Sequence, residues 1–277
     1  MTAIALPGAH AETLASALSR QTRPANASPL VATRVFAWRS VLKIKHVPEQ
    51  LLDVLAIPVI FTLMFTYLFG GALSGSTGAY LQFLLPGTLV MTVLLLTMYT
   101  AVGLNTDITT GVTDRFRSLP IWQPAPIVGA LAGDVARYLI ASGLVLGLGF
   151  AIGFHAEGGA TGIAAALALI LAFAFSLSWI WTTLAVLVRS PNSIINLGMM
   201  VLFPLTLASN VFVDPKTTPA WLEAFIKVNP VSHLVTAARG LIDGNAATAE
   251  IVWVLVADLV IVVLFAPLTM WVYGRER

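Results

Sequence analysis

Between Asp53 and Asp107 the chain contains no charged residue. A helix needs about 20 mostly apolar residues to cross the hydrocarbon core of a membrane, and residues 54–73 and 81–104 both meet that requirement. Four more apolar stretches follow, at residues 127–153, 162–188, 194–213 and 251–273. Backbone groups in lipid must bond to one another, and runs this long without alternation are typical of helices rather than barrel strands. The sequence therefore predicts six transmembrane helices.

The composition excludes a soluble globular domain. Of 277 residues, 58% are hydrophobic and 10% are charged, whereas soluble domains carry about 25% charged residues. The absence of cysteine excludes disulfides, thiolate metal sites and thiol catalysis. Residues 1–28 contain no apolar run and so lack the core of a signal peptide. We expect an all-α integral membrane protein, with a disordered cytoplasmic tail at residues 1–28 and a transmembrane domain at residues 29–277.

Lysine and arginine predict the orientation, because short cytoplasmic loops carry an excess of these residues. If both termini are cytoplasmic, three basic residues lie outside, and Arg137 lies near the inner end of the third span. The outer residues are Lys216, Lys227 and Arg239. The inner residues are Arg20, Arg23, Arg34, Arg39, Lys43, Lys45, Arg115, Arg117, Arg189, Arg275 and Arg277. The segment "TDRFRSLPIWQPAP", residues 113–126, is then a cytoplasmic loop between the second and third spans.

The segment before the first span, "PLVATRVFAWRSVLKIKHVPEQ", has the pattern of an amphipathic helix. Val31, Val35, Trp38 and Leu42 recur at helical spacing. Basic residues flank this stripe: Arg34 and Lys45 on one side, Arg39 and Lys43 on the other. Such a helix lies in the membrane interface, with its basic side chains reaching lipid headgroups. The alternative is a helix packed on the inner face of the protein itself.

Short helices are expected on the outer side, between the fifth and sixth spans. "TPAWLEAFIKV" predicts one, and "NPVSHLVTAARGLIDG" predicts another, with Asn229 as its cap, Pro230 in its first turn and Gly244 after its end. The third span contains pairs of glycines four residues apart, which allow helices to approach closely in lipid. We expect these pairs to pack within the bundle rather than form a dimer face. The pairs are Gly129 with Gly133, Gly143 with Gly147, and Gly149 with Gly153.

Motifs of several enzyme classes are absent. The chain has no phosphate-binding loop ending in Gly-Lys-Ser/Thr, no His-Glu-x-x-His and no Gly-x-Ser-x-Gly. Its four histidines are far apart in the sequence, which argues against a metal site. Three ionisable residues at membrane depth are functional candidates. Asp134 and Arg137 are three residues apart and can neutralise each other. Asp258 fits either a proton relay or a hydrogen bond to a Ser or Thr of a neighbouring helix.

Two segments resemble a known family. Residues 105–137, "NTDITTGVTDRFRSLPIWQPAPIVGALAGDVAR", resemble the first cytoplasmic loop and third span of ABC-2 type export permeases, especially the bacterial daunorubicin/doxorubicin-resistance subfamily. Residues 229–244, "NPVSHLVTAARGLIDG", resemble the Asn-Pro segment before the last span of the same subfamily. The resemblance extends from about Pro29 to the end of the chain.

The resemblance implies a bacterial cell membrane subunit that pairs with a second copy of itself or with a homologous permease. Two copies of a separate ATPase subunit would bind ATP and Mg²⁺, so we expect no cofactor or nucleic acid on this chain. The interfacial helix and the loop at residues 113–126 would touch the ATPase. Asp114, Arg115 and Arg117 would supply polar contacts, and Phe116 an apolar knob. The alternative is a solvated turn whose arginines only fix the topology.

The implied substrate is an amphipathic small molecule, either a drug-like antibiotic or a lipid. The family places its pathway at the dimer interface, along the first, second and fifth spans. Candidate lining residues are Phe65, Phe69, Met91, Met98, Met199, Met200 and Phe203, although such side chains also serve packing and lipid contact. Two other classes of function are the alternatives. A proton-coupled secondary transporter would use Asp258, and a membrane enzyme would need clustered acids or histidines at the inner face, which the sequence lacks.

Overall fold

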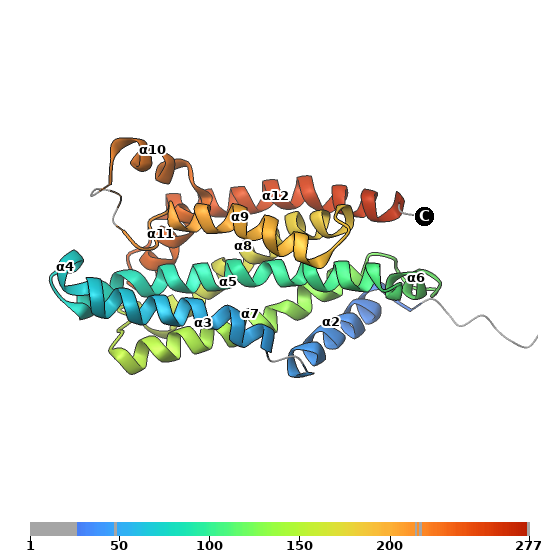
Figure 1. Cartoon of the computed structure of the whole chain (residues 1–277), viewed down its shortest axis with the longest axis horizontal. Coiled ribbons are helices and arrows are strands. Elements are labelled where there is room, and N and C mark those ends of the chain that lie inside the picture. Colours follow the sequence, from blue (N-terminus) through green and yellow to red (C-terminus); the bar gives the residue numbers. More distant parts are fainter. Residues whose placement is uncertain (1–26, 47–48, 214, 216–217, 276–277) are drawn as a thin grey trace, which may run out of the picture.

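The computed structural model describes residues 27–46, 49–213, 215 and 218–275, and every regular element in these ranges is a helix (Figure 1). In chain order the elements are α2 (Pro29–His46), α3 (Glu49–Met64), the π-helix η1 (Phe65–Phe69), α4 (Gly70–Ser74), α5 (Thr77–Thr109), α6 (Val112–Arg117), α7 (Ala125–Ile152), α8 (Gly159–Leu187), α9 (Pro191–Leu207), α10 (Ala220–Val228), α11 (Pro230–Ile242) and α12 (Thr248–Arg275).

Five helical stretches are long and apolar enough to cross a membrane, and α9 is a shorter apolar helix. The prediction of an all-α membrane protein is confirmed. The tail expected at residues 1–28 lies outside the described residues except for its last two. Helix α6 and the C-terminal end of α12 lie at one end of the bundle, here called the α6 end. Helices α4, α10 and α11 lie at the opposite end, the α10 end (Figure 1).

Helix α5 forms the centre of the bundle, and α7, α8, α9 and α11 pack around it. Most of its side chains between Tyr80 and Ala101 are buried. Its 33 residues correspond to about 50 Å at 1.5 Å per residue, whereas the hydrocarbon core is about 30 Å thick. Helix α5 is therefore longer than the hydrocarbon core is thick, and its charged residue, Asp107, lies in its last turn.

The first predicted span, residues 54–73, falls on three consecutive segments, α3, η1 and α4. Pro58 lies inside α3 and has no backbone N–H to donate. The hydroxyl of Thr62 donates to the carbonyl of Pro58 at 2.8 Å. The π-helix follows directly, and Gly70 then lies so close to α5 that a Cβ atom there would be 2.9 Å from the Cα of Thr77. Gly70 therefore allows the start of α4 to lie against the start of α5, and the chain turns between these helices at Gly75, whose φ is 72°.

The α10 end is closed by the Asn-Pro segment and by two glycines. Asn229 caps α11, as predicted: its side-chain oxygen accepts from the N–H of Val231 at 2.9 Å. Its amide also donates to two carbonyls at the end of α9, so one residue joins two helix termini. Gly158 and Gly162 at the start of α8 lie against the backbone of Leu241. A Cβ atom at Gly162 would be 2.3 Å from the Leu241 carbonyl oxygen, so this contact requires glycine.

Candidate functional site

Helix α6 lies at the beginning of the loop that we expected between the second and third spans. Gly111 precedes it with φ of 73°, a conformation that favours glycine. The Phe116 ring is half-buried and packs edge-on against Phe36 of α2, with 4.9 Å between ring centroids. Asp114 and Arg115 are exposed, and the side chain of Arg117 lies outside the described part. The apolar residue of α6 thus faces the protein, and two polar residues face outward.

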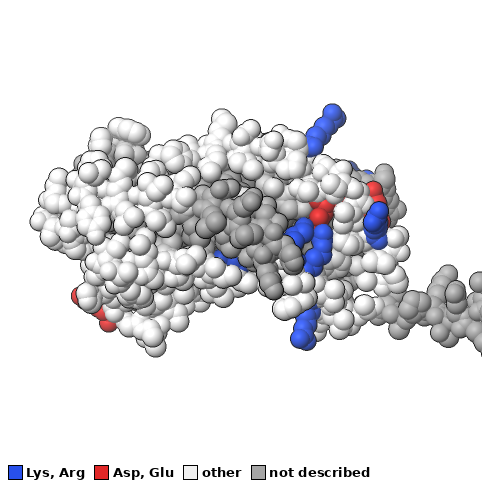
Figure 2. Space-filling view, turned by 60° about the horizontal axis from the view of Figure 1, so that its bottom comes forward, with Lys and Arg blue, Asp and Glu red and all other residues white. Residues whose placement is uncertain are grey.

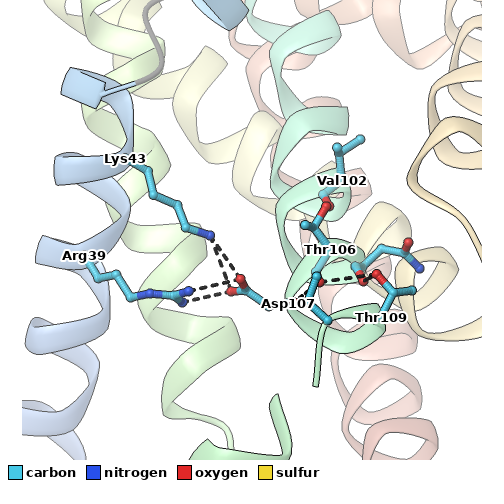
Figure 3. A network of polar contacts seen from close by, with 8 residues as sticks. Arg39, Lys43, Val102, Thr106, Asp107 and Thr109 are labelled. Carbon is cyan, nitrogen blue, oxygen red and sulfur yellow. Dashed lines mark hydrogen bonds and ion pairs between the residues drawn. The ribbon is translucent and has the colours of Figure 1, made fainter. Parts of the chain in front are cut away.

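A cluster of three charged side chains joins α2 to the end of α5 (Figure 3). The Arg39 guanidinium donates to both carboxylate oxygens of Asp107, at 2.8 and 3.0 Å. The Lys43 ammonium donates to the same carboxylate at 3.2 and 3.4 Å. Arg39 also lies 5.1 Å from the centroid of the Phe116 ring. We call Arg39, Lys43 and Asp107 the α2–α5 clamp, since together with Phe116 they connect α2, α5 and α6.

The clamp changes the interpretation of the amphipathic helix. Arg39 and Lys43 were expected to reach lipid headgroups, but the structure gives both of them a carboxylate of the protein. Asp107 was not among the predicted site residues, because its only signal in the sequence is a lone acid at the end of a long apolar run. Arg34 and Trp38 remain exposed on α2. Most Lys and Arg side chains visible in Figure 2 gather toward the α6 end.

Helix α2 packs tightly on α7 through the first pair of glycines. A Cβ atom at Gly129 would be 2.4 Å from the Cβ of Phe36, and one at Gly133 would be 2.4 Å from the Cβ of Ser40. The second pair differs, because a Cβ atom at Gly143 or Gly147 would meet nothing within 4 Å. The first pair therefore packs within the protein, as expected, with α2 as its partner. The second pair lies on an open face of α7.

The ion pair expected between Asp134 and Arg137 is present, at 3.1 Å. Both residues are buried, and Asp134 also accepts a hydrogen bond from the Thr100 hydroxyl of α5. Tyr138 connects this group to α8, with its hydroxyl 3.2 Å from that of Ser178. A cavity of about 40 Å³ lies between this buried network and the α2–α5 clamp, and both line it. That volume holds one or two waters, so polar groups continue from the clamp into the membrane span.

Asp258 lies on α12, where it is 7% exposed. Neither of its carboxyl oxygens has a hydrogen-bond partner among the described residues. Ser176 of α8 faces it, but the Ser176 hydroxyl donates to the Ala172 carbonyl at 3.0 Å. The hydroxyl contact between these two helices comes instead from Thr183 and Thr269, whose oxygens are 2.6 Å apart. Thr183 and Thr269 thus join the two helices, and Ser176 is the hydroxyl of α8 that lies beside Asp258.

The candidate pathway residues differ in their exposure. Met91 and Met98 of α5 are fully buried in the core, and Phe65 packs against Phe212 at 5.0 Å between ring centroids. Met199 is half-buried. Phe69, Met200 and Phe203 are exposed, so these three remain candidates for contact with a substrate or a second subunit. Among the described residues, no three His, Asp or Glu side chains gather as a metal site.

Comparison with known proteins adds an independent line of evidence. A family model described as "ABC-2 type transporter" matches residues 31–242. The chain is 46% identical over 264 residues to the daunorubicin resistance ABC transporter permease protein DrrB1 of Streptomyces coeruleorubidus, covering 95% of this chain and 93% of that protein. It is 27% identical over 238 residues to the doxorubicin resistance ABC transporter permease protein DrrB of Mycobacterium tuberculosis, covering 82% of this chain and 80% of that protein.

Proposed function

This chain belongs to the ABC-2 type transporter family, and we propose that it is the membrane-spanning subunit of an ATP-driven exporter in a bacterial cell membrane. A separate ATPase subunit, present in two copies, binds ATP and Mg²⁺. The observation that carries the proposal is the 46% identity to a drug-resistance permease over 95% of this chain. The sequence contains no phosphate-binding loop, which supports the placement of the ATP site on the separate subunit.

The substrate class follows from the same similarity. The relatives are named for daunorubicin and doxorubicin resistance, so we infer that this chain exports an amphipathic small molecule, a drug-like antibiotic or a lipid. Two permease subunits form the pathway between them. Phe69, Met200 and Phe203 are the exposed candidates for its wall, because adaptable apolar side chains suit varied ligands. The buried Met91 and Met98 belong to the packed core of each subunit.

Helix α6 is the proposed contact with the ATPase. Phe116 and Phe36 fasten it to α2, and α2 is clamped to α5 through Asp107. A displacement of α6 caused by a partner at Asp114 and Arg115 is therefore transmitted through α2 to the central helix α5. In this scheme Phe116 is an inward anchor of α6, while the polar residues of α6 meet the partner.

The first prediction separates these two roles. Arg115→Ala changes an exposed side chain, so we expect normal thermal stability but weaker co-purification with the ATPase. Phe116→Ala removes the contact with Phe36, so we expect bound ATPase whose hydrolysis no longer responds to substrate. Arg189→Ala, which alters an exposed arginine in the α8–α9 loop, is the matched control. If the double variant of Arg115 and Phe116 leaves both co-purification and hydrolysis unchanged, α6 is not the coupling element.

A second candidate, proton-coupled transport through Asp258, is supported by one observation. Asp258 is a buried acid without a hydrogen-bond partner among the described residues, and acids at membrane depth are often part of proton pathways. This function requires transport driven by a proton gradient in the absence of an ATPase.

A further inference from the structure

An apolar groove of about 610 Å³ runs between α2 and α7 near the α6 end. Val31, Val35 and Trp38 of α2 form one wall. Ala132 and Gly133 of α7 form the other. Trp38 is 64% exposed and Val35 is 61% exposed, so the apolar stripe predicted on α2 faces away from the protein.

The groove continues onto the open face of α7. Leu139 and Ile140 follow Ala132 at seven and eight residues, which places them on the same side of the helix, and both are exposed. Leu144 and Phe150 extend this exposed apolar face toward the α10 end. Because α7 is long enough to span a membrane, a hydrocarbon chain lying in the groove can run on along α7 within the bilayer.

The rim of the groove carries one positive charge. Arg34 lines the groove, and no acidic residue does. Of the basic side chains of α2 that the structure describes, Arg39 and Lys43 are paired with Asp107. Arg34 has no ion-pair partner among the described residues and is exposed. A tryptophan beside it is typical of the membrane–water interface, where its amphipathic ring lies at the level of the headgroups.

We propose that this groove is a binding site for an anionic phospholipid of the leaflet on the α6 side. Arg34 binds the headgroup phosphate, Trp38 lies at the level of the glycerol backbone, and one acyl chain lies over Ala132 along α7. The lipid rests on α2, which is packed on α7 and clamped to α5. Lipid composition therefore acts on the same helices that connect to α6.

The test uses the fluorescence of Trp38 in the full-length protein. Phosphatidylglycerol or phosphatidylcholine with brominated acyl chains, which quench tryptophan, is added at equal mole fraction to unbrominated phosphatidylcholine vesicles. The chain has seven tryptophans, so the signal of Trp38 is the difference between the wild-type protein and Trp38→Phe. At low ionic strength we expect the lipid site beside Trp38 to prefer brominated phosphatidylglycerol over brominated phosphatidylcholine about fivefold, as measured by the quenching of Trp38. This is the preference that one basic residue near anionic lipid contributes.

Three variants complete the design. Arg34→Gln should abolish the preference for phosphatidylglycerol, and Arg189→Gln, an exposed arginine outside the groove, should keep it. Ala132→Phe fills the acyl-chain part of the groove and should reduce quenching by both lipids. Equal quenching of wild-type Trp38 by the two lipids overturns the proposal, and so does a preference that survives Arg34→Gln. Absence of quenching by either lipid would mean that protein covers the groove, either residues 1–26 or a second subunit, and also overturns it.

Discussion

Two acidic side chains at membrane depth differ in their surroundings. Asp134 has Arg137 within 3.1 Å and a hydrogen bond from Thr100, so its charge is balanced where it is buried. Asp258 has no such partner among the described residues. A buried charge is tolerated when it is paired and hydrogen-bonded. The structure therefore explains Asp134 as part of a polar network and leaves Asp258 as the residue to test for a separate function.

Asp258→Asn distinguishes the two proposed functions. The amide has nearly the same shape as the carboxyl group but cannot take up and release a proton as a proton relay requires. If the chain is the subunit of an ATP-driven exporter, we expect most ATP-dependent transport to remain. The measurement is substrate efflux from liposomes containing the permease and its ATPase, with and without a proton gradient. Near-complete loss of transport in a folded Asp258→Asn protein would favour the proton-coupled function.

Sequence spacing predicted the contacts that lie within one helix but not those between helices. Asp134 and Arg137 are three residues apart, so helical geometry alone places them together. Their partner Thr100 lies on α5, and Tyr138 reaches Ser178 on α8. Hydroxyl groups are common in membrane spans, and periodicity does not say which of them face each other. For the same reason Asp107 was not recognised as the partner of Arg39.

At the scale of the helices, the glycine pairs of α7 have the same spacing but lie on two different surfaces, one packed on α2 and one open. Gly133 allows the backbone of α2 to approach, whereas Gly147 faces open space. The sequence predicted close packing at the glycine pairs but gave no means of telling which pair would be used or which helix would pack there. The partner is α2. The apolar stripe of α2 suggested contact with lipid, and the opposite side of this helix, around Phe36, packs on α7.

Gly133→Ala should displace α2 from α7. The added methyl group would lie 2.4 Å from the Cβ of Ser40 and 2.6 Å from the carbonyl oxygen of Ala37. Overpacking of this kind typically costs about 1–3 kcal/mol. The matched control is Gly147→Ala on the same helix, which meets nothing within 4 Å and should be neutral or stabilising because alanine favours helix. Thermal unfolding in detergent compares the two, and equal melting temperatures would contradict the packing seen at Gly133.

Asp107→Asn should loosen the α2–α5 clamp. Removing a charged hydrogen-bond partner costs about 1–3 kcal/mol, and we expect the lower end because Arg39 and Lys43 are 36% and 44% exposed, so water screens the pair. A double-mutant cycle with Arg39→Gln isolates the interaction, since residues in direct contact show a coupling free energy. Additive losses in the free energy of unfolding would mean that Arg39 and Asp107 contribute independently.

At the scale of the whole molecule, the bundle has two chemically different ends. The α6 end holds the α2–α5 clamp and helix α6, while the α10 end is closed by short helices and by backbone contacts at Gly158 and Gly162. The six predicted spans correspond to five helical stretches long enough to cross a membrane and the shorter helix α9, and their apolar character followed from the sequence. The centrality of α5 did not, since all long spans are apolar and only packing decides which of them is surrounded.

The last prediction concerns orientation: the α6 end should be cytoplasmic. Most basic residues of the short loops belong to that end, and such residues are retained on the cytoplasmic side.

The chain has no native cysteine, so single cysteines report accessibility without background. We expect His155→Cys, in the exposed turn between α7 and α8, to react in intact cells with a membrane-impermeant maleimide. Gly274→Cys, exposed near the end of α12 with no atom within 4 Å of an added Cβ, should react only after the membrane is permeabilised. Labelling of Gly274→Cys in intact cells would place the C-terminus outside. It would also remove α6 from the compartment that contains ATP, and the proposed contact with the ATPase would then be impossible.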